Sequence, residues 1–393
     1  MPSQSLLFEP NLTKHCDASA PLSACIYRFQ QNNFDLIRLL AALQVAVQHS
    51  HMHLFVPLAP LLAGLVNLFP GVPIFFFVSG LLISRSYERS GGLGRFAINR
   101  GLRIYPALWV CTAVSIIAVF LVGYRSAGLT FAEFATWTCA QTTFVQFYNP
   151  EFMRGFGVGV LNGSLWTIAV ELQFYVLAPC LYRVGLIENR RLIATMLFFL
   201  TINRLFYYGC GPLGLADAWW MKVVGVTFAV HFYMFLAGVF VQRNFDAFER
   251  VLAGRGRSIV ICYLVFATLA RQIVPTLSLD NGIHPLLFVP LCLAVFSLAF
   301  SCRTCSERLL KGNDISYGLY IYHMPIVNCF RYFNWVGSPV NLAAALVLSI
   351  VAGWLSWRRV ERPAMALKPV SLKHGECPDV IAPRKHVALP VAA

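Results

Sequence analysis

Long apolar stretches, separated by shorter polar segments, recur along the chain from about residue 34 to residue 357. A helix needs about 20 mostly apolar residues to cross the hydrocarbon core of a bilayer. The pattern therefore predicts an all-α integral membrane protein, a bundle of about ten transmembrane helices in one domain over 34–357. Residues 1–33 and 358–393 are predicted to be polar segments outside the bundle. The predicted spans are 34–57, 62–84, 105–124, 164–184, 191–209, 220–241, 257–275, 284–301, 313–333 and 340–357.

The composition supports a membrane protein over a set of soluble domains. Of the 393 residues, 58% are hydrophobic and only 12% are charged, whereas about a quarter of the residues in a soluble domain are charged. The lipid bilayer is thus an expected partner. The first 33 residues have no apolar core, so we expect no secretory signal peptide.

The positive charge of the chain indicates its orientation in the membrane. A net formal charge of +14 first suggests a nucleic-acid partner. However, most Lys and Arg residues fall in alternate segments between the predicted spans, which is the positive-inside distribution. We therefore expect no nucleic-acid partner, and we expect both termini in the cytoplasm.

Ionisable side chains inside predicted spans are costly and mark candidate functional residues. Glu171 is the one acidic residue well within a span, and the spans also contain His49, His231 and His323. The helical rise places Glu171 about 10 Å from the outer surface and His323 about 15 Å from the inner surface. Arg38 precedes His49 by about three turns, so both face one side, with Arg38 near the inner surface. These groups converge near mid-depth, although a packing role for His231 remains equally open.

The histidines near the end of the first span raise the question of a metal site. His51 points away from His49 because helical residues two apart face nearly opposite sides, so only His53 shares the side of His49. The chain also contains no HExxH motif. We expect no metal.

The polar segment 85–109 contains an RxxR pair, Arg100 and Arg103. Three residues apart on a helix, the two guanidiniums share one face, and such forks suit phosphate groups. The alternative is a positive-inside anchor that contacts anionic lipids. The residues alone leave both interpretations open.

Five stretches, in the same order, resemble motifs of the membrane-bound acyltransferase 3 family, which includes O-antigen acetylases. They are FDLIRLLAALQVAVQH (34–49), VPIFFFVSGLLISRSY (72–87), FAINRGLRIYPALW (96–109), SLWTIAVELQFYVLAP (164–179) and ISYGLYIYHMPIV (315–327). Their key features are Arg followed by His in the first span, RxxR-I-x-P, S-L-W-x-x-x-x-E and S-Y-x-x-Y-x-x-H-x-P. One departure is Pro73, which stands where many members have an acidic residue.

This resemblance implies transfer of an acyl group, usually acetyl, from cytoplasmic acyl-CoA to a hydroxyl group. Acetyl-CoA is then the expected co-substrate, and a carbohydrate or glycolipid is the expected acceptor. The implied acceptors are O-antigen, exopolysaccharide or, by similarity to small one-domain members, a nodulation factor. The implied location is the bacterial inner membrane, which the chain would cross several times.

The acyl-transfer chemistry assigns roles to the residues inside the spans. An attacking hydroxyl must lose its proton, and a neutral imidazole has a suitable pKa to take it. The motif and its depth both favour His49 as the general base. We expect Glu171 to pair with His49, or else to hold the sugar or tie helices together. His323 is expected to hold the acceptor or to stabilise charge.

The basic residues at the inner surface are the expected donor site. Arg100 and Arg103 are predicted to bind the phosphates of CoA, so that the pantetheine arm carries the thioester inward toward His49. Arg38 is predicted either to extend this phosphate site or to pair with Asp35.

The rival function is a secondary transporter, in which buried His and Glu residues form a proton relay. No inverted repeat is visible in the chain, and the loop with the RxxR pair suits anion binding better. A membrane scaffold without catalysis would leave Glu171 unexplained.

Overall fold

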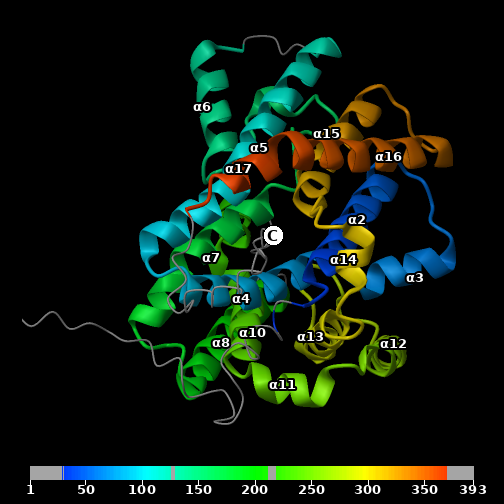
Figure 1. Ribbon diagram of the computed structural model, residues 1–393. Coiled ribbons are helices and arrows are strands. Elements are labelled where there is room, and N and C mark those ends of the chain that lie inside the picture. Colours follow the sequence, from blue (N-terminus) through cyan, green and yellow to red (C-terminus); the bar gives the residue numbers. More distant parts are fainter. Residues whose placement is uncertain (1–28, 30, 125–128, 211–217, 370–393) are drawn as a thin grey trace, which may run out of the picture.

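The computed structural model describes residues 29, 31–124, 129–210 and 218–369. All regular structure in these ranges is helical, and they contain no strand (Figure 1). The all-α fold predicted from the hydropathy pattern is thus confirmed for the described residues. Most of the predicted N-terminal segment 1–33 and most of the predicted tail 358–393 lie outside these residues.

A helix lies in each of the ten stretches predicted to span the membrane. These helices are α2 (Phe34–His53), α3 (Pro60–Leu68) with α4 (Gly71–Arg89), α5 (Leu93–Leu121), α7 (Trp166–Arg183), α8 (Asn189–Arg204), α9 (Trp219–Gly225) with α10 (Phe228–Arg243), α12 (Gly256–Ile273), α13 (Pro285–Ala299), α15 (Ser316–Tyr332) and α16 (Pro339–Ser356). Among the described residues, six helical runs are long and apolar enough to cross a membrane, namely 60–89, 93–121, 189–209, 219–243, 256–273 and 339–366. The structure therefore supports a membrane protein but leaves the count of ten a prediction.

Helices α2, α7 and α15 are absent from those six runs. They are the helices that contain His49, Glu171 and His323, respectively. Polar side chains lower the mean hydropathy of α2 and α7, and α15 has only 17 residues. A span that encloses polar groups within a bundle does not need an apolar surface all round.

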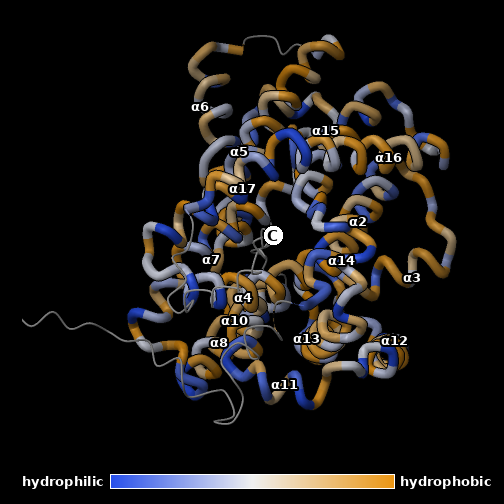
Figure 2. The backbone as a smooth tube through the Cα atoms, in the orientation of Figure 1, coloured by the Kyte–Doolittle hydropathy of each residue, from blue (hydrophilic) through white to orange (hydrophobic). Residues whose placement is uncertain are grey.

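Several helices lie outside the predicted spans. Helix α6 (Phe131–Thr142) comes after the C-terminal end of α5 in the chain, and a short turn, η1 (Glu151–Met153), precedes α7. Helices α11 (Phe245–Leu252) and α14 (Cys305–Leu310) lie in connections, and the irregular turn η3 (Trp357–Glu361) leads from α16 to α17 (Arg362–Ala366). A second irregular turn, η2 (Leu205–Gly209), continues α8 within its predicted span. Figure 2 shows hydrophobic residues along most of the helices.

Small residues let the central helices approach closely. Helix α10 packs against α4, and a Cβ atom at Gly80 would overlap the carbonyl oxygen of Phe235. A Cβ atom at Gly238 would likewise overlap the carbonyl oxygen of Phe77. Close backbone approach of this kind is the usual basis of helix packing in membranes, where the hydrophobic effect between helices is weak.

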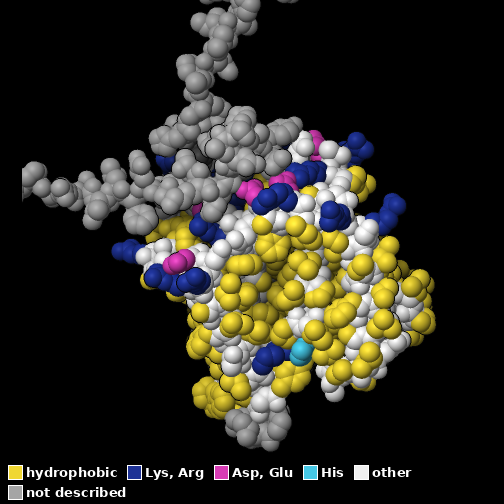
Figure 3. All heavy atoms as spheres, turned by 90° about the horizontal axis from the view of Figure 1, so that it is seen from below, with side chains coloured by type: hydrophobic (Ala, Val, Ile, Leu, Met, Phe, Trp, Pro, Cys, Tyr) yellow, Lys and Arg dark blue, Asp and Glu magenta, His cyan; other side chains and the backbone are white. Residues whose placement is uncertain are grey.

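Helix α15 lies within the bundle and packs against α2, α5 and α16 (Figure 1). Most of its residues are buried, including His323, which is fully buried. Figure 3 shows a largely apolar face of the molecule, with most of the visible charged residues along one edge. His323 of α15 is thus enclosed within the bundle.

Candidate active site

The packing of α2 against α15 brings two histidines into contact. The Nδ1 atom of His49 lies 2.8 Å from the Nε2 atom of His323, although the two residues are 274 positions apart in the chain. Their rings are stacked, with centroids 5.1 Å apart. The sequence predicted that both histidines lie near mid-depth, and the structure shows that they form a direct pair.

The partners of these rings determine where their protons lie. The Nδ1 atom of His323 is 2.6 Å from the carbonyl oxygen of Tyr320, which can only accept a hydrogen bond. In the neutral ring, Nε2 of His323 is then the acceptor, so His49 donates to it through Nδ1. The Nε2 atom of His49 is left with a free lone pair. No described residue forms a hydrogen bond with that atom, so it is available to a substrate.

The remaining histidines of α2 differ in position. His53 lies one turn beyond His49, with ring centroids 5.9 Å apart, as helical spacing predicts. His51 forms no ring contact with His49. Among the described residues, no group of three or more His, Cys, Asp or Glu side chains is arranged to hold a metal ion.

Glu171 has different partners from the one expected. Its Oε1 atom accepts hydrogen bonds from the Ser79 hydroxyl at 3.1 Å and from the Tyr175 hydroxyl at 2.8 Å. Helix α7 packs against α4 and α10, so Glu171 meets Ser79 of α4, whereas the ring partner of His49 is His323. The second oxygen of Glu171, Oε2, receives no hydrogen bond from the described residues.

Two of the three expected phosphate ligands are paired with carboxylates. Arg38 and Arg103 both form ion pairs with Asp314. The Nη1 atom of Arg38 lies 2.9 Å from the Asp314 carboxylate, and Arg103 also lies 3.7 Å from the Glu361 carboxylate. The contact between Arg38 and Asp35 is longer, 3.9 Å. Asp314, in the loop before α15, thus bridges Arg38 of α2 and Arg103 of α5. Asp314 immediately precedes the ISYGLYIYHMPIV stretch and was not predicted as a site residue, because it lies outside the motif itself.

Arg100 keeps hydrogen-bonding capacity for a ligand. It donates to the Ser86 hydroxyl at 2.9 Å, and its guanidinium lies 5.8 Å from the ring centroid of Tyr175. Its Nε has no hydrogen-bond partner among the described residues. Arg100 forms no ion pair with a described carboxylate, in contrast to Arg38 and Arg103.

A further cation, Lys368, lies close to Arg100 and Arg103. Lys368 was not predicted as a site residue from the sequence. It follows α17, which packs against α5 and whose Met365 sulfur lies 3.6 Å from Arg103. Burial, together with the positive charges of Arg100 and Arg103, lowers the pKa of Lys368 to about 8. Clustered cations raise the local positive potential, and an anion bound among them relieves their mutual repulsion. Nothing in the motifs marks Lys368, because its place depends on how α17 folds back on α5.

Two tyrosines of the last motif, Tyr317 and Tyr320, connect α15 to other helices, whereas His231, outside the motifs, bonds to a nearby backbone carbonyl. The Tyr320 hydroxyl contacts Thr167 Oγ1 at 2.6 Å, and the Tyr317 hydroxyl donates to the carbonyl oxygen of Ile104 at 3.1 Å. His231 donates through Nε2 to the carbonyl oxygen of Gly225 at 3.1 Å and is only 1% exposed. These contacts favour the packing interpretation of His231.

Comparisons with known proteins agree with the motifs. The family model described as an acyltransferase domain, of the acyltransferase 3 type, matches residues 31–358. Nodulation protein 10 of Rhizobium leguminosarum bv. viciae is 31% identical over 354 residues, which cover 86% of this chain and 94% of that protein. An O-acetyl transferase of Shigella phage Sf6 is 26% identical over 346 residues, 85% of this chain and 96% of that protein. A peptidoglycan O-acetyltransferase of Listeria monocytogenes is 24% identical over 75% of this chain and 51% of that protein.

No solved structure matches this chain. The family assignment rests on the match over 31–358 and on the relatives, and it favours an enzyme over the rival transporter. The resemblance seen in the five motifs is confirmed: this chain belongs to the acyltransferase 3 family and is an acyltransferase.

Proposed function

We propose that this protein transfers an acetyl group from cytoplasmic acetyl-CoA to a sugar hydroxyl of a surface glycan or lipo-oligosaccharide. The names of its relatives support this choice, since they include O-acetyltransferases, one of peptidoglycan, and a nodulation protein. O-antigen, exopolysaccharide and a nodulation factor are the candidate acceptors. The proposed setting is the bacterial inner membrane, with ten spans and both termini in the cytoplasm, in agreement with the positive-inside distribution.

The chain of hydrogen bonds from His49 through His323 to the Tyr320 carbonyl is the observation that carries the proposal. It leaves Nε2 of His49 unprotonated and fixes the ring in that orientation. A sugar hydroxyl that donates to this nitrogen loses its proton to it as its oxygen attacks the thioester carbonyl. The new C–O bond forms, the C–S bond breaks, and the thiolate of CoA takes the proton back from His49.

His323 has a supporting role in this step. When His49 accepts the proton, its Nδ1–H becomes a stronger donor, and the lone pair on Nε2 of His323 stabilises the resulting imidazolium. His323 is therefore a positioning residue, which acts through His49. A buried histidine in this role does not need to touch the acceptor.

Glu171 is proposed to bind the acceptor. Ser79 and Tyr175 hold one of its oxygens, and the other is free to accept a hydrogen bond from a sugar hydroxyl. Tyr175 also lies under Arg100, so Glu171 is linked to the donor side of the bundle.

The donor phosphates are proposed to bind at Arg100 and Lys368, with Arg38 and Arg103 at the same mouth. Arg100 and Lys368 have no carboxylate partner among the described residues, whereas Asp314 already neutralises part of the charge of the other two. Ligand phosphates gain most from cations whose donors are not already used.

Replacement of Arg100 by Ala is expected to raise KM for acetyl-CoA about tenfold, the worth of one charge-assisted hydrogen bond. The acceptor KM should change little, because Arg100 lies at the donor mouth. Steady-state kinetics with each substrate varied in turn measure both constants. Arg95, exposed near the start of α5, is the matched control, and Arg95→Ala should behave as the unmodified protein. Equal increases in the two KM values would argue against donor binding at Arg100.

Lys368 predicts a pH dependence of donor binding. Because its pKa is lowered to about 8, the side chain is charged below that pH and loses its charge as the pH rises through it. KM for acetyl-CoA should rise about two- to fivefold between pH 7 and pH 9. This is the loss expected when a partly exposed ion pair, here between the Lys368 ammonium and a donor phosphate, is removed. Lys368→Gln should remove this rise, and Lys368→Arg should keep KM low throughout. A rise that persists unchanged in Lys368→Gln would assign it to another group.

A labelling experiment tests the whole proposal. Membranes with and without this protein are incubated with acetyl-CoA that carries a labelled acetyl group and with glycolipid and polysaccharide fractions. Base-labile label in one fraction, present only with the protein, is the expected result. A second incubation with longer acyl-CoA donors identifies the preferred acyl group. Absence of label with every donor and every fraction would overturn the assignment of acyl-CoA as donor.

A further inference from the structure

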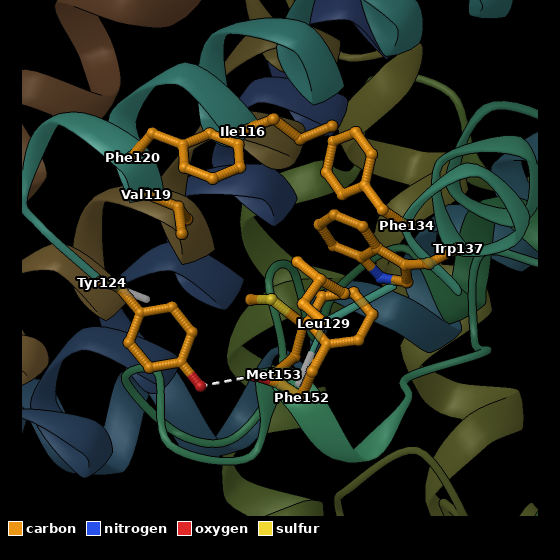
Figure 4. A pocket seen from close by; sticks show the side chains of 9 residues that line it. All are labelled: Ile116, Val119, Phe120, Tyr124, Leu129, Phe134, Trp137, Phe152 and Met153. Atoms are coloured by element: carbon orange, nitrogen blue, oxygen red, sulfur yellow. Dashed lines mark hydrogen bonds between the residues drawn. The ribbon is translucent and has the colours of Figure 1, made fainter. Parts of the chain in front are cut away.

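A cavity of about 240 Å³ lies between the C-terminal end of α5, helix α6 and the residues around η1 (Figure 4). Its walls are apolar and include Ile116 and Val119 of α5, Phe134 and Trp137 of α6, and Met153 of η1. It is larger than the roughly 150 Å³ apolar cavity that admits a benzene molecule. The cavity suits a hydrocarbon chain, because the side chains that line it are apolar apart from the Tyr124 hydroxyl and the Trp137 indole N–H.

One polar group in this apolar wall lacks a partner. Trp137 is 2% exposed, and its Nε1–H has no hydrogen-bond partner among the described residues. Figure 4 shows its indole ring among the side chains that line the cavity. By contrast, the Tyr124 hydroxyl donates to the carbonyl oxygen of Phe152 at 2.5 Å. A buried N–H without an acceptor is costly, so the cavity suits a ligand with an oxygen acceptor at the head of its chain.

The cavity is connected to the candidate active site through the segment that follows η1. Asn162 donates to the carbonyl oxygen of Ile321 at 2.7 Å, and Asn328 accepts from the backbone N–H of Val158 at 3.0 Å. These bonds hold α15 on both sides of His323. The turn η1, which directly precedes this segment, contributes Met153 to the cavity wall.

The position of the cavity distinguishes it from the donor site. Ile116 follows Arg100 by 16 residues along α5, a distance of about 24 Å for a continuous helix. The cavity therefore lies at the other end of α5 from the proposed phosphate site. A chain bound there therefore stays clear of the phosphates of the donor.

We infer that this cavity binds the acyl chain of a lipid-linked acceptor, whose ester or amide carbonyl accepts a hydrogen bond from Trp137. This inference rests on the proposed function, since it names the acceptor as an acylated sugar. The chain fills the apolar space, and the carbonyl satisfies the indole N–H. The sugar, attached at the head of the chain, then extends along the segment after η1 toward His49.

The test compares two acceptors on the full chain in lipid nanodiscs. One is an oligosaccharide with an N-palmitoyl chain, and the other is the same oligosaccharide with an N-acetyl group. The expected result is a higher kcat/KM for the palmitoylated acceptor. Ile116→Trp places a larger side chain in the cavity. It should lower the ratio of kcat/KM for the palmitoylated acceptor to kcat/KM for the acetylated one about tenfold, because a few methylene groups of the palmitoyl chain lose their contacts.

Two variants keep this test independent of folding. Ile117 is the adjacent isoleucine on α5 and is 56% exposed, so Ile117→Trp should keep the ratio of the unmodified protein. Trp137→Phe removes the indole N–H but keeps a six-membered aromatic ring in the cavity wall. It should lower the same ratio about threefold, the worth of a weak hydrogen bond. An unchanged ratio in both Ile116→Trp and Trp137→Phe would overturn the inference.

A cross-linking experiment separates this inference from the proposed function. The palmitoyl chain carries a diazirine, and mass spectrometry maps the site that it labels. Labelling of the peptide with Met153, reduced in Ile116→Trp, supports the chain site even if no acetyl transfer is detected. If palmitamide without a sugar prevents labelling as effectively as the acylated oligosaccharide does, the cavity holds any membrane lipid and the acceptor assignment is wrong.

Discussion

His49→Ala is expected to lower kcat for acetyl transfer by about 10²–10⁴-fold, the usual contribution of a general base. Without the imidazole, the sugar hydroxyl has no acceptor for its proton at the moment of attack. KM for acetyl-CoA should change little, because His49 lies on α2 about three turns from Arg38 and the proposed phosphate site. The measurement is the initial rate of base-labile label transfer from acetyl-CoA with the acceptor in excess.

His53 supplies a matched control for this prediction. It lies on the same helix one turn farther on, with its ring centroid 5.9 Å from that of His49, but it is not part of the chain to the Tyr320 carbonyl. His53→Ala should therefore keep most of the activity. Full turnover by His49→Ala, with normal expression, would show that another group takes the proton.

A variant of His323 tests the proposed hydrogen-bond chain. His323→Phe removes the acceptor of the His49 Nδ1–H but keeps a ring of similar shape against α2. The effect should lie on kcat and should be smaller than that of His49→Ala. His323→Gln, which offers an acceptor oxygen, should recover part of the rate. Such recovery separates a positioning role from simple loss of packing.

The sequence contained enough to predict the helices and part of the site. Apolar stretches of sufficient length indicate where helices cross a membrane, and the structure has a helix in each predicted stretch. The helical rise also placed His49 and His323 at similar depths. Their direct contact is consistent with that prediction, because two residues at one depth on adjacent helices can meet.

The partners of the remaining residues depended on which helices are neighbours, and hydropathy carries no such information. Glu171 meets Ser79 because α7 packs against α4. Asp314 lies 276 positions from Arg38, so no local spacing in the sequence indicates that the two side chains meet. Helix α6 and its cavity were missed because α6 is too short, at 12 residues, to show as a span.

The pairs with Asp314 predict a large loss of stability when that carboxylate is removed. Arg103 and Arg38 both form ion pairs with it, and the side chain of Arg103 is only 11% exposed. Removal of one partner from a buried ion pair costs about 3–5 kcal/mol, because it leaves uncompensated buried charge. Asp314→Asn should therefore lower the unfolding temperature of the detergent-solubilised protein by about 4–6 °C. Fluorescence-detected size-exclusion chromatography after heating measures this change.

Asp35 provides the matched control, because it also faces Arg38 but only at 3.9 Å and with a side chain that is 58% exposed. Asp35→Asn should change the unfolding temperature by about 2 °C at most, as expected of a surface pair. If Asp314→Asn proves as mild as Asp35→Asn, the two arginines do not depend on Asp314. They would then be available for the phosphates of the donor, and the donor site would extend from Arg100 and Lys368 to all four cations. A marked loss of stability would instead assign Arg38 and Arg103 to holding α2, α5 and α15 together, with donor binding left mainly to Arg100 and Lys368.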